Sequence, residues 1–358
     1  MNQDQIKQLN EAVEAVKTRK IENVYFVACG GSKAIFDPAQ FIFDRETTLP
    51  SFVYNANEFI HRCPKGLGEN SLVVTCSHSG NTLETTRATQ LAGDKGALTI
   101  SFSYRVDSPL WKATQHPISY VWGPESDPGD NNNGMLYRLV FSILNVLQPN
   151  EKYERAIKAC DNLGKVYAAN KAKFAESAKA FGKKYKNNKL IYTMSSGPCY
   201  GVAYSFAICL LQEMQWIHSE PIHSGEFFHG PFEVTDTDVP FIVLKNYENV
   251  KKNWITEYGA DYKRPLVEID SAVGAYSDSM NGETRVLDVR AEAFIKRFSE
   301  HVIPIDCNEF DMEGIDEDLR NYFAVLVAGV VLRSYADEIA YYRGHPLSVR
   351  RYMWCMEY

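Results

Sequence analysis

The sequence has no Cys-x-x-Cys pair and no Cys and His spacing that is typical of a metal site, although it contains eight cysteines. Several of these cysteines lie inside apolar, strand-like runs, so we expect buried free thiols and no bound metal. Free thiols fit a reducing cytoplasm. Cys29, Cys76 and Cys199 flank glycine-containing turns, but no motif places a base that would activate them, so thiol catalysis is not predicted.

The chain also lacks an apolar stretch long enough to span a bilayer, and Met1–Lys20 is polar and amphipathic rather than a signal peptide. It has neither a Walker loop nor the glycine spacing of a Rossmann fingerprint. No basic stripe is present, and a formal net charge of −7 with a calculated pI of 5.7 argues against a nucleic-acid partner. A phosphorylated small molecule remains compatible, because backbone amides and hydroxyls can hold phosphate.

What the sequence does contain is a repeated alternation of strand and helix. Apolar runs at 23–28 and 72–76 each end in a turn of small residues that is followed by a helical pattern, which predicts a doubly wound parallel sheet. The segments 24–31 and 191–198 resemble one another and indicate an internal repeat. With 358 residues, two domains of this α/β class are expected.

We place the domain boundaries from this pattern. The predicted parts are an N-terminal helix (1–20), a first domain (21–150), a bridging helix (151–187), a second domain (188–335) and a C-terminal tail (336–358). The stretch 245–280 looks like an insertion in the second domain, with one possible strand at 265–269, and no function is assigned to it.

The string Ser-His-Ser-Gly-Asn-Thr (77–82) follows an apolar run and opens a helix. A helix start offers unpaired amide donors and the positive end of the helix dipole, and hydroxyls can add further donors to such an anion site. Taken alone, the string is also typical of an ordinary helix start capped by Ser or Thr.

A second string places Glu213 near the end of an apolar helix and His229, sixteen residues later, directly before a Gly-Pro turn. Sugar enolisation needs one group that takes a proton from carbon and another that moves a proton at the neighbouring oxygen or nitrogen. A structural carboxylate paired with His218 or a lysine is the alternative for Glu213. His218 and His223 are alternatives to His229, and Glu226 is interpreted as shaping the turn.

Together the strings 77–82 and 210–233 resemble those of the sugar isomerase (SIS) domain superfamily. The isomerase half of glucosamine-6-phosphate synthases has the same Glu, the same spacing and a similar Gly-Glu-x-x-His-Gly-Pro string. This chain differs in having Leu210 in place of a lysine, and in lacking a glutaminase domain and a lysine-bearing tail. Its ending, Arg-Arg-Tyr (350–352) and a final Glu-Tyr, is more similar to the deglycases of 6-phosphorylated fructosamines. The resemblance covers nearly the whole chain.

The resemblance implies two SIS domains, each a parallel sheet flanked by helices, in a homodimer whose active sites lie at the subunit interface. Loop 77–82 would hold the sugar phosphate, while Gly-Glu-Thr-Arg (282–285) in the second domain has lost both serines, so one phosphate site per chain is expected. Glu213 would be the base and His229 its helper, with no metal or organic cofactor. The implied substrate-binding residues are Gly30, Gly31, Ser32, Ser77, His78, Ser79, Thr82, Asn132, Ser195, Ser196 and Tyr358.

Two other functions remain open from the sequence. An aldose–ketose isomerase of the glucosamine 6-phosphate type would use the same enolisation on a substrate with another C1 substituent. A sugar-phosphate-sensing SIS protein without catalysis would not need the Glu213–His229 pair, and such proteins usually carry a helix-turn-helix domain that is not found in this sequence.

Overall fold

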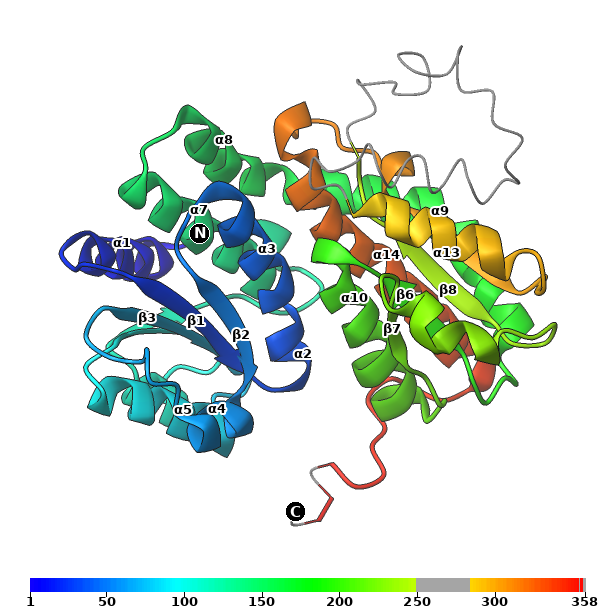
Figure 1. Cartoon of the computed structure of the whole chain (residues 1–358), viewed down its shortest axis with the longest axis horizontal. Helices are drawn as coiled ribbons and strands as arrows, with labels where there is room; N and C mark the ends of the chain where they lie inside the picture. The colour runs from blue at the N-terminus through cyan, green and yellow to red at the C-terminus, as the bar shows by residue number, and fades with distance from the viewer. Residues whose placement is uncertain (249–283, 354, 357–358) are drawn as a thin grey trace. The chain divides into compact units, whose positions relative to one another are not determined.

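The computed structural model (Figure 1) describes residues 1–248, 284–353 and 355–356. The chain forms two compact units, the first made of residues 1–167 with 314–316 and the second of the remaining residues. Each unit is built around its own parallel sheet. The predicted fold class, α/β with parallel sheets flanked by helices, is therefore confirmed.

The first unit contains a five-stranded parallel sheet in the order β2-β1-β3-β4-β5. Its strands are β1 (Asn23–Ala28), β2 (Ser51–Asn55), β3 (Ser71–Cys76), β4 (Leu98–Ser103) and β5 (His116–Ser119). All residues of β3 and β4 are buried, as is typical of inner strands of a parallel sheet that is covered on both faces. In β1 and β3, Ala28 is paired with Cys76, so the turns that follow these two strands lie at the same edge.

Alternate residues of β1 point to opposite faces of this sheet. Tyr25 and Val27 join a core cluster with Phe59 and Ala88 from the helices on one face, whereas Phe26 packs against Phe36 on the other, with ring centroids 5.4 Å apart. Figure 1 shows these two helical layers on either side of β1. The helices of the unit are α1 (Gln3–Lys17), α2 (Gly30–Ala34), α3 (Phe36–Glu46), α4 (Ala56–Arg62), α5 (Leu83–Asp94), α6 (Pro109–Ala113), η1 (Pro128–Asp130), α7 (Asn132–Leu147), α8 (Glu151–Ala159) and η2 (Cys160–Asn162).

The second unit contains a four-stranded parallel sheet in the order β7-β6-β8-β9, which repeats the order of β2, β1, β3 and β4. Its strands are β6 (Tyr192–Ser195), β7 (Pro221–His223), β8 (Phe241–Lys245) and β9 (Val302–Asp306). Its helices are η3 (Gly197–Cys199), α10 (Tyr200–Tyr204), η4 (Ser205–Met214), η5 (Phe227–His229), η6 (Pro231–Val234), α13 (Arg285–Ile295), η7 (Cys307–Glu309), η8 (Glu317–Leu319) and α14 (Arg320–Arg343). Among the described residues, none of the helices combines the length and hydropathy needed to cross a membrane.

Three predicted boundaries differ from the structure. The bridging segment 151–187 is not one helix: α8 and α9 (Leu163–Tyr185) are separated by the 3-10 turn η2, and the boundary between the two units falls inside α9. The predicted domain end at 335 lies inside α14, whose buried apolar face continues to Ala340, so the tail begins at Gly344.

The predicted insertion at 245–280 starts too early, because Lys245 ends β8 and the next residue, Asn246, is buried. The possible strand at 265–269 lies outside the described residues.

The helix that carries Glu213 also differs from the prediction. An apolar helix was expected here, and the structure has a π-helix of ten residues, η4, that begins directly after α10. A π-helix is rare and is frequently found at functional sites. Trp216, two residues after the end of this helix, has a φ of +56°, a left-handed conformation that is uncommon for a residue with a side chain.

Candidate active site

The loop 77–82 connects β3 to α5 at the carboxyl edge of the first sheet. The buried Ser77 hydroxyl lies 2.9 Å from the Thr82 hydroxyl and accepts a hydrogen bond of 3.1 Å from the Gly80 amide. Gly80 has a φ of +67°, and a Cβ at this position would lie 2.0 Å from the Ser108 hydroxyl oxygen. Only glycine therefore fits this turn without strain. Ser79 is exposed at its tip.

Thr82 occupies the N-cap position of α5, yet its side chain makes no capping hydrogen bond. An ordinary capped helix start, which was the alternative prediction, would use that hydroxyl on the first-turn amides. Instead the hydroxyl lies beside Ser77, so the amides at the start of α5 remain available for an external anion. This arrangement favours the anion-site interpretation of the loop.

The turn after β1 lies beside this loop. Gly30 has a φ of +54°, and Ser32 belongs to the short helix α2. Burial raises the pKa of the Cys76 thiol to about 12, with a smaller opposing effect of a hydrogen bond from Ser32, which places Ser32 at the end of β3. A thiol with this pKa is protonated at neutral pH, in agreement with the prediction that Cys76 is not a nucleophile.

His78 is exposed, but its ring contacts three aromatic side chains. Its Nδ1 lies 2.9 Å from the Tyr120 hydroxyl, and its ring stacks on Tyr104 with centroids 5.1 Å apart. Trp122 meets the same ring edge-on at 5.0 Å. The predicted substrate residue Asn132 lies elsewhere in the unit, in the first turn of α7.

In the second unit, Glu213 lies near the end of η4 and forms an ion pair with Arg350 of the C-terminal segment. The Nε and Nη2 atoms of Arg350 each lie 2.8 Å from Oε1 of Glu213. The Glu213 side chain is 23% exposed and that of Arg350 only 8%. The predicted structural alternative, a pairing of Glu213 with His218 or a lysine, is therefore wrong, since the partner is an arginine.

His229 ends the short helix η5, directly before Gly230. It lines a small cavity of about 90 Å³ together with Ser224, Gly225, Phe228, Leu287 and Arg290. His229 is exposed. Its backbone amide donates a hydrogen bond of 2.9 Å to the carbonyl of Glu226. Glu226 therefore shapes the turn through its backbone, as predicted.

The two other histidines have different environments. His223 accepts a hydrogen bond of 3.1 Å from the Gly225 amide and packs edge-on against Tyr200. Burial lowers the pKa of His223, against a smaller opposing effect of Glu226. His218 forms a backbone bridge with Leu190. Of these three histidines, His229 is the one that lines the cavity formed with Ser224 and Arg290.

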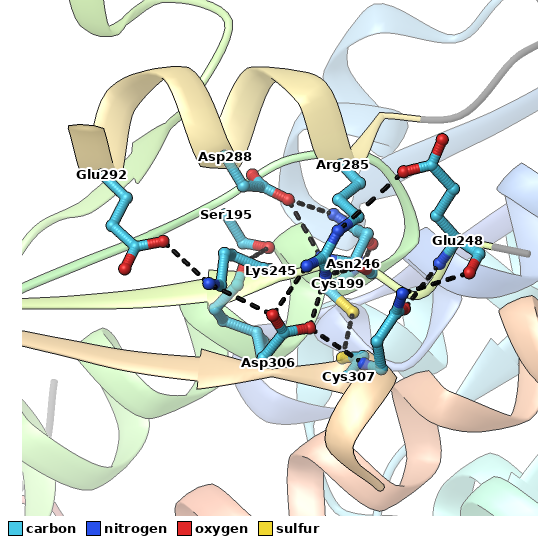
Figure 2. Close-up of polar contacts among 12 residues, drawn as sticks. Ser195, Cys199, Lys245, Asn246, Glu248, Arg285, Asp288, Glu292, Asp306 and Cys307 are labelled. Carbon is cyan, nitrogen blue, oxygen red and sulfur yellow. Dashed lines mark hydrogen bonds and ion pairs between the residues drawn. The ribbon is translucent and has the colours of Figure 1, made fainter. Parts of the chain in front are cut away.

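The carboxyl edge of the second sheet, where a phosphate loop would correspond to 77–82, is filled by a network of paired charges (Figure 2). Lys245 lies 2.8 Å from Glu292 and 3.1 Å from Asp306. Arg285 donates to both oxygens of Asp306, in one case at 2.6 Å. A Cβ on Gly197 would lie 2.2 Å from the Thr284 hydroxyl oxygen, so the turns pack directly on one another. In the part of this edge that the structure describes, the charged side chains are thus paired with one another.

Asp288 lies at the centre of a second part of this network. It accepts hydrogen bonds from the Ser224 hydroxyl at 2.6 Å, and from the Asn246 side chain and amide at 2.7 and 3.0 Å. Burial raises the pKa of Asp288 to about 6, with smaller opposing effects of these hydrogen bonds. Because Ser224 lines the cavity of His229, Asp288 fixes one wall of that cavity.

The predicted substrate residues of the second domain are used inside the fold. Ser195 donates to the Leu244 carbonyl at 2.8 Å and Ser196 to the Thr284 carbonyl at 2.9 Å, and both are fully buried. These contacts do not support a direct role for either hydroxyl in substrate binding. Tyr358 lies outside the described residues. Arg350, Asp288 and Arg290 were missed by the sequence analysis, and only the aromatic tail around Arg350 carried a signal, since such a tail needs a surface on which to pack.

Comparisons with known proteins agree with this architecture. The SIS domain model matches residues 17–147. Fructosamine deglycase FrlB of Bacillus subtilis (strain 168) is 44% identical over 98% of this chain and 97% of its own, and fructoselysine 6-phosphate deglycase of Escherichia coli (strain K12) is 26% identical over 95% and 88%.

Two crystal structures, each assigned as a phosphosugar isomerase, have the same fold along nearly the whole chain. The one from Bacillus subtilis has a TM-score of 0.87 and 44% identity over 98% of this chain and 97% of its own. The one from Salmonella typhimurium LT2 has a TM-score of 0.86 and 34% identity over 100% and 98%. The chain therefore belongs to the SIS-domain family and, within it, to the fructosamine deglycases.

Proposed function

We propose that this protein is a deglycase that converts a 6-phosphorylated fructosamine and water to glucose 6-phosphate and a free amino acid. The observation that carries this proposal is the identity of 44% with a fructosamine deglycase along 97% of that protein's length. The fructoselysine 6-phosphate deglycase of E. coli supports a substrate that bears a phosphate.

The reaction begins with the open-chain substrate, in which C1 bears the amino acid nitrogen and C2 is a ketone. The ketone acidifies the C1 protons, and Glu213 removes one of them to give an enaminol. Reprotonation at C2 then gives an imine at C1, and addition of water to this imine releases glucose 6-phosphate and the amine. The substrate's own carbonyl and nitrogen hold the charge of the intermediate, and the protein contributes proton transfer and positioning.

The substrate phosphate binds to loop 77–82, where Ser77, Ser79, Thr82 and the first amides of α5 act as donors. The hydroxyl pair formed by Ser77 and Thr82 and the left-handed turn at Gly80 support this assignment, because they keep the loop in a fixed shape before the ligand binds. Gly30, Gly31 and Ser32 border the same edge and contact the sugar.

His229 moves protons at the sugar oxygens during ring opening and enolisation, from the cavity that it shares with Arg290. The enzyme acts as a homodimer, and His229 serves a site whose phosphate loop belongs to the partner chain. All eight cysteines are free, which suits an enzyme of the cytoplasm.

The test is product analysis with a panel of 6-phosphorylated fructosamines that includes fructoselysine 6-phosphate linked through the α or the ε nitrogen and fructose-aspartate 6-phosphate. We expect at least one of them to release glucose 6-phosphate, and the unphosphorylated compounds to react far more slowly. Interconversion of fructose 6-phosphate and glucose 6-phosphate, without cleavage of any fructosamine, would instead assign the protein as an aldose–ketose isomerase.

A further inference from the structure

The C-terminal segment that follows α14 is fastened to the end of η4, within three residues of Glu213. The side chain of Gln215 donates to the His345 carbonyl at 2.7 Å, and the Trp216 ring packs edge-on against the His345 ring, with centroids 4.4 Å apart. Arg351 also lies over the Trp216 ring, with its guanidinium carbon 4.3 Å from the ring centroid. The segment is thus held on this helix end by contacts on both sides of Arg350.

Within the segment, the backbone around Arg350 forms a turn that supports the guanidinium. Nη1 of Arg350 donates to the carbonyls of Leu347 at 2.7 Å and Val349 at 3.0 Å. The two other donors, Nε and Nη2, reach Oε1 of Glu213. With 8% exposure, the Arg350 side chain is held in one orientation by the chain around it.

The contact is one-sided with respect to the carboxylate. The Nε and Nη2 atoms of Arg350 both contact Oε1 of Glu213, and among the described residues Oε2 accepts no hydrogen bond. A carboxylate that acts as a base uses one oxygen for the proton and gains from having the other fixed, because the geometry of proton transfer from carbon is demanding. The Glu213 side chain alone has three rotatable bonds and would otherwise sample several orientations.

We propose that Arg350 is a positioning residue for Glu213: the C-terminal segment brings its guanidinium to Oε1 and leaves Oε2 open for the C1 proton of the substrate. The docked segment is therefore part of the active site, although it lies 137 residues from Glu213 in the sequence. This inference rests on the proposed function, since it assigns to Glu213 the removal of the C1 proton.

The test compares Arg350→Ala, Arg350→Lys and the control Arg333→Gln, at an exposed arginine of α14, in the full-length enzyme. The substrate is the 6-phosphorylated fructosamine of the panel that the parent enzyme cleaves fastest. Arg350→Ala should lower kcat by about 10- to 100-fold, as a misplaced catalytic group does, with KM changed by less than about threefold. Arg350→Lys should recover only part of the rate, because an ammonium cannot provide the fork of donors. Arg333→Gln removes an equal charge from a side chain that is 46% exposed and should keep kcat near that of the parent.

Two further measurements separate positioning from a loss of structure. Added guanidinium chloride, at concentrations well below those that unfold the protein, should raise kcat of Arg350→Ala and leave kcat of Arg333→Gln unchanged. The double variant Glu213→Gln/Arg350→Ala should be no slower than Glu213→Gln, because Arg350 acts only through the carboxylate.

The outcomes are distinguishable. A parent enzyme that releases glucose 6-phosphate while Arg350→Ala keeps its full rate, or gains rate, would overturn the inference and leave the proposed function intact. A loss of kcat in Arg350→Ala that guanidinium does not rescue, and that persists in the Glu213→Gln background, would assign the segment a purely structural role, which also overturns it. A parent enzyme that cleaves no fructosamine of the panel would contradict the proposed function, and this inference with it.

Discussion

The hydroxyl oxygens of Ser77 and Thr82 lie 2.9 Å apart across the turn between β3 and α5. This contact draws the Thr82 side chain away from the helix cap and leaves the amides at the start of α5 available. A six-residue loop is thereby shaped for an anion before any ligand is bound.

Thr82→Ala should raise KM for a phosphorylated fructosamine by about 10-fold or more while lowering kcat much less, because a phosphate contact is present in both the ground state and the transition state. Steady-state kinetics measure both constants. Thr82→Ser keeps the hydroxyl and is the matched control, with KM close to that of the parent. A similar rise in KM for unphosphorylated and phosphorylated substrates would argue against a phosphate site in this loop.

Glu213→Gln should bind substrate but lose about 100- to 10,000-fold in kcat, since the amide cannot act as a base. The amide oxygen can still accept hydrogen bonds from Arg350, so the local structure should be kept. Glu226→Gln is the control, because Glu226 is exposed and forms its turn through the backbone. If Glu226→Gln were the slow variant and Glu213→Gln the active one, the assignment of the base would be reversed.

His229→Asn should also lose most of its turnover, and a mixing experiment tests whether His229 serves the partner's site. In a dimer of one His229→Asn chain and one Glu213→Gln chain, a shared site arrangement leaves one site with both residues intact. Differently tagged chains allow the mixed dimers to be purified. Their activity should approach half that of the parent under this arrangement, whereas mixed dimers without activity would show that both residues come from one chain.

The stability of the protein should depend on pH through Asp288. Burial raises the pKa of Asp288 to about 6 from an ordinary 3.8, so the folded state binds this proton more readily than the unfolded state does. The stabilising contribution of protonation is complete below about pH 4 and is lost as the pH rises through about 6. A shift of about two pKa units corresponds to on the order of 2 to 3 kcal/mol.

Asp288→Asn removes this titration. The free energy of unfolding of the parent minus that of Asp288→Asn, from urea titrations, should therefore be larger at pH 4.5 than at pH 7.5. Asp316→Asn, at an exposed carboxylate, should show a much smaller dependence. An equal difference at both pH values would mean that Asp288 does not titrate as its buried position requires.

The sequence was sufficient for features that depend on neighbouring residues. The apolar run 72–76 followed by Ser-His-Ser-Gly-Asn-Thr predicted a strand, a tight turn and a helix start, because apolar pattern, glycine and hydroxyl residues all act locally. The π-helix at 205–214 could not be predicted, since a short segment that is mostly apolar does not distinguish a helical turn of one width from another.

Long-range contacts account for what the sequence analysis missed. Ser195 and Ser196 were expected to bind the substrate from the resemblance to the SIS superfamily, but their hydroxyls donate to the carbonyls of Leu244 and Thr284, which lie 49 and 88 residues away. The Arg350–Glu213 ion pair spans 137 residues, and no periodicity in one sequence reveals such a contact.

The measurement that tests the central claim most directly is the simultaneous quantification of glucose 6-phosphate and free amino acid during incubation of the parent enzyme with each 6-phosphorylated fructosamine of the panel. A deglycase that works through a C1 imine must release the two products in equal amounts, and Glu213→Gln must release far less of both over the same time. If every 6-phosphorylated fructosamine of the panel stayed intact in the presence of the parent enzyme, or if the amino acid were released without glucose 6-phosphate, the account would be contradicted.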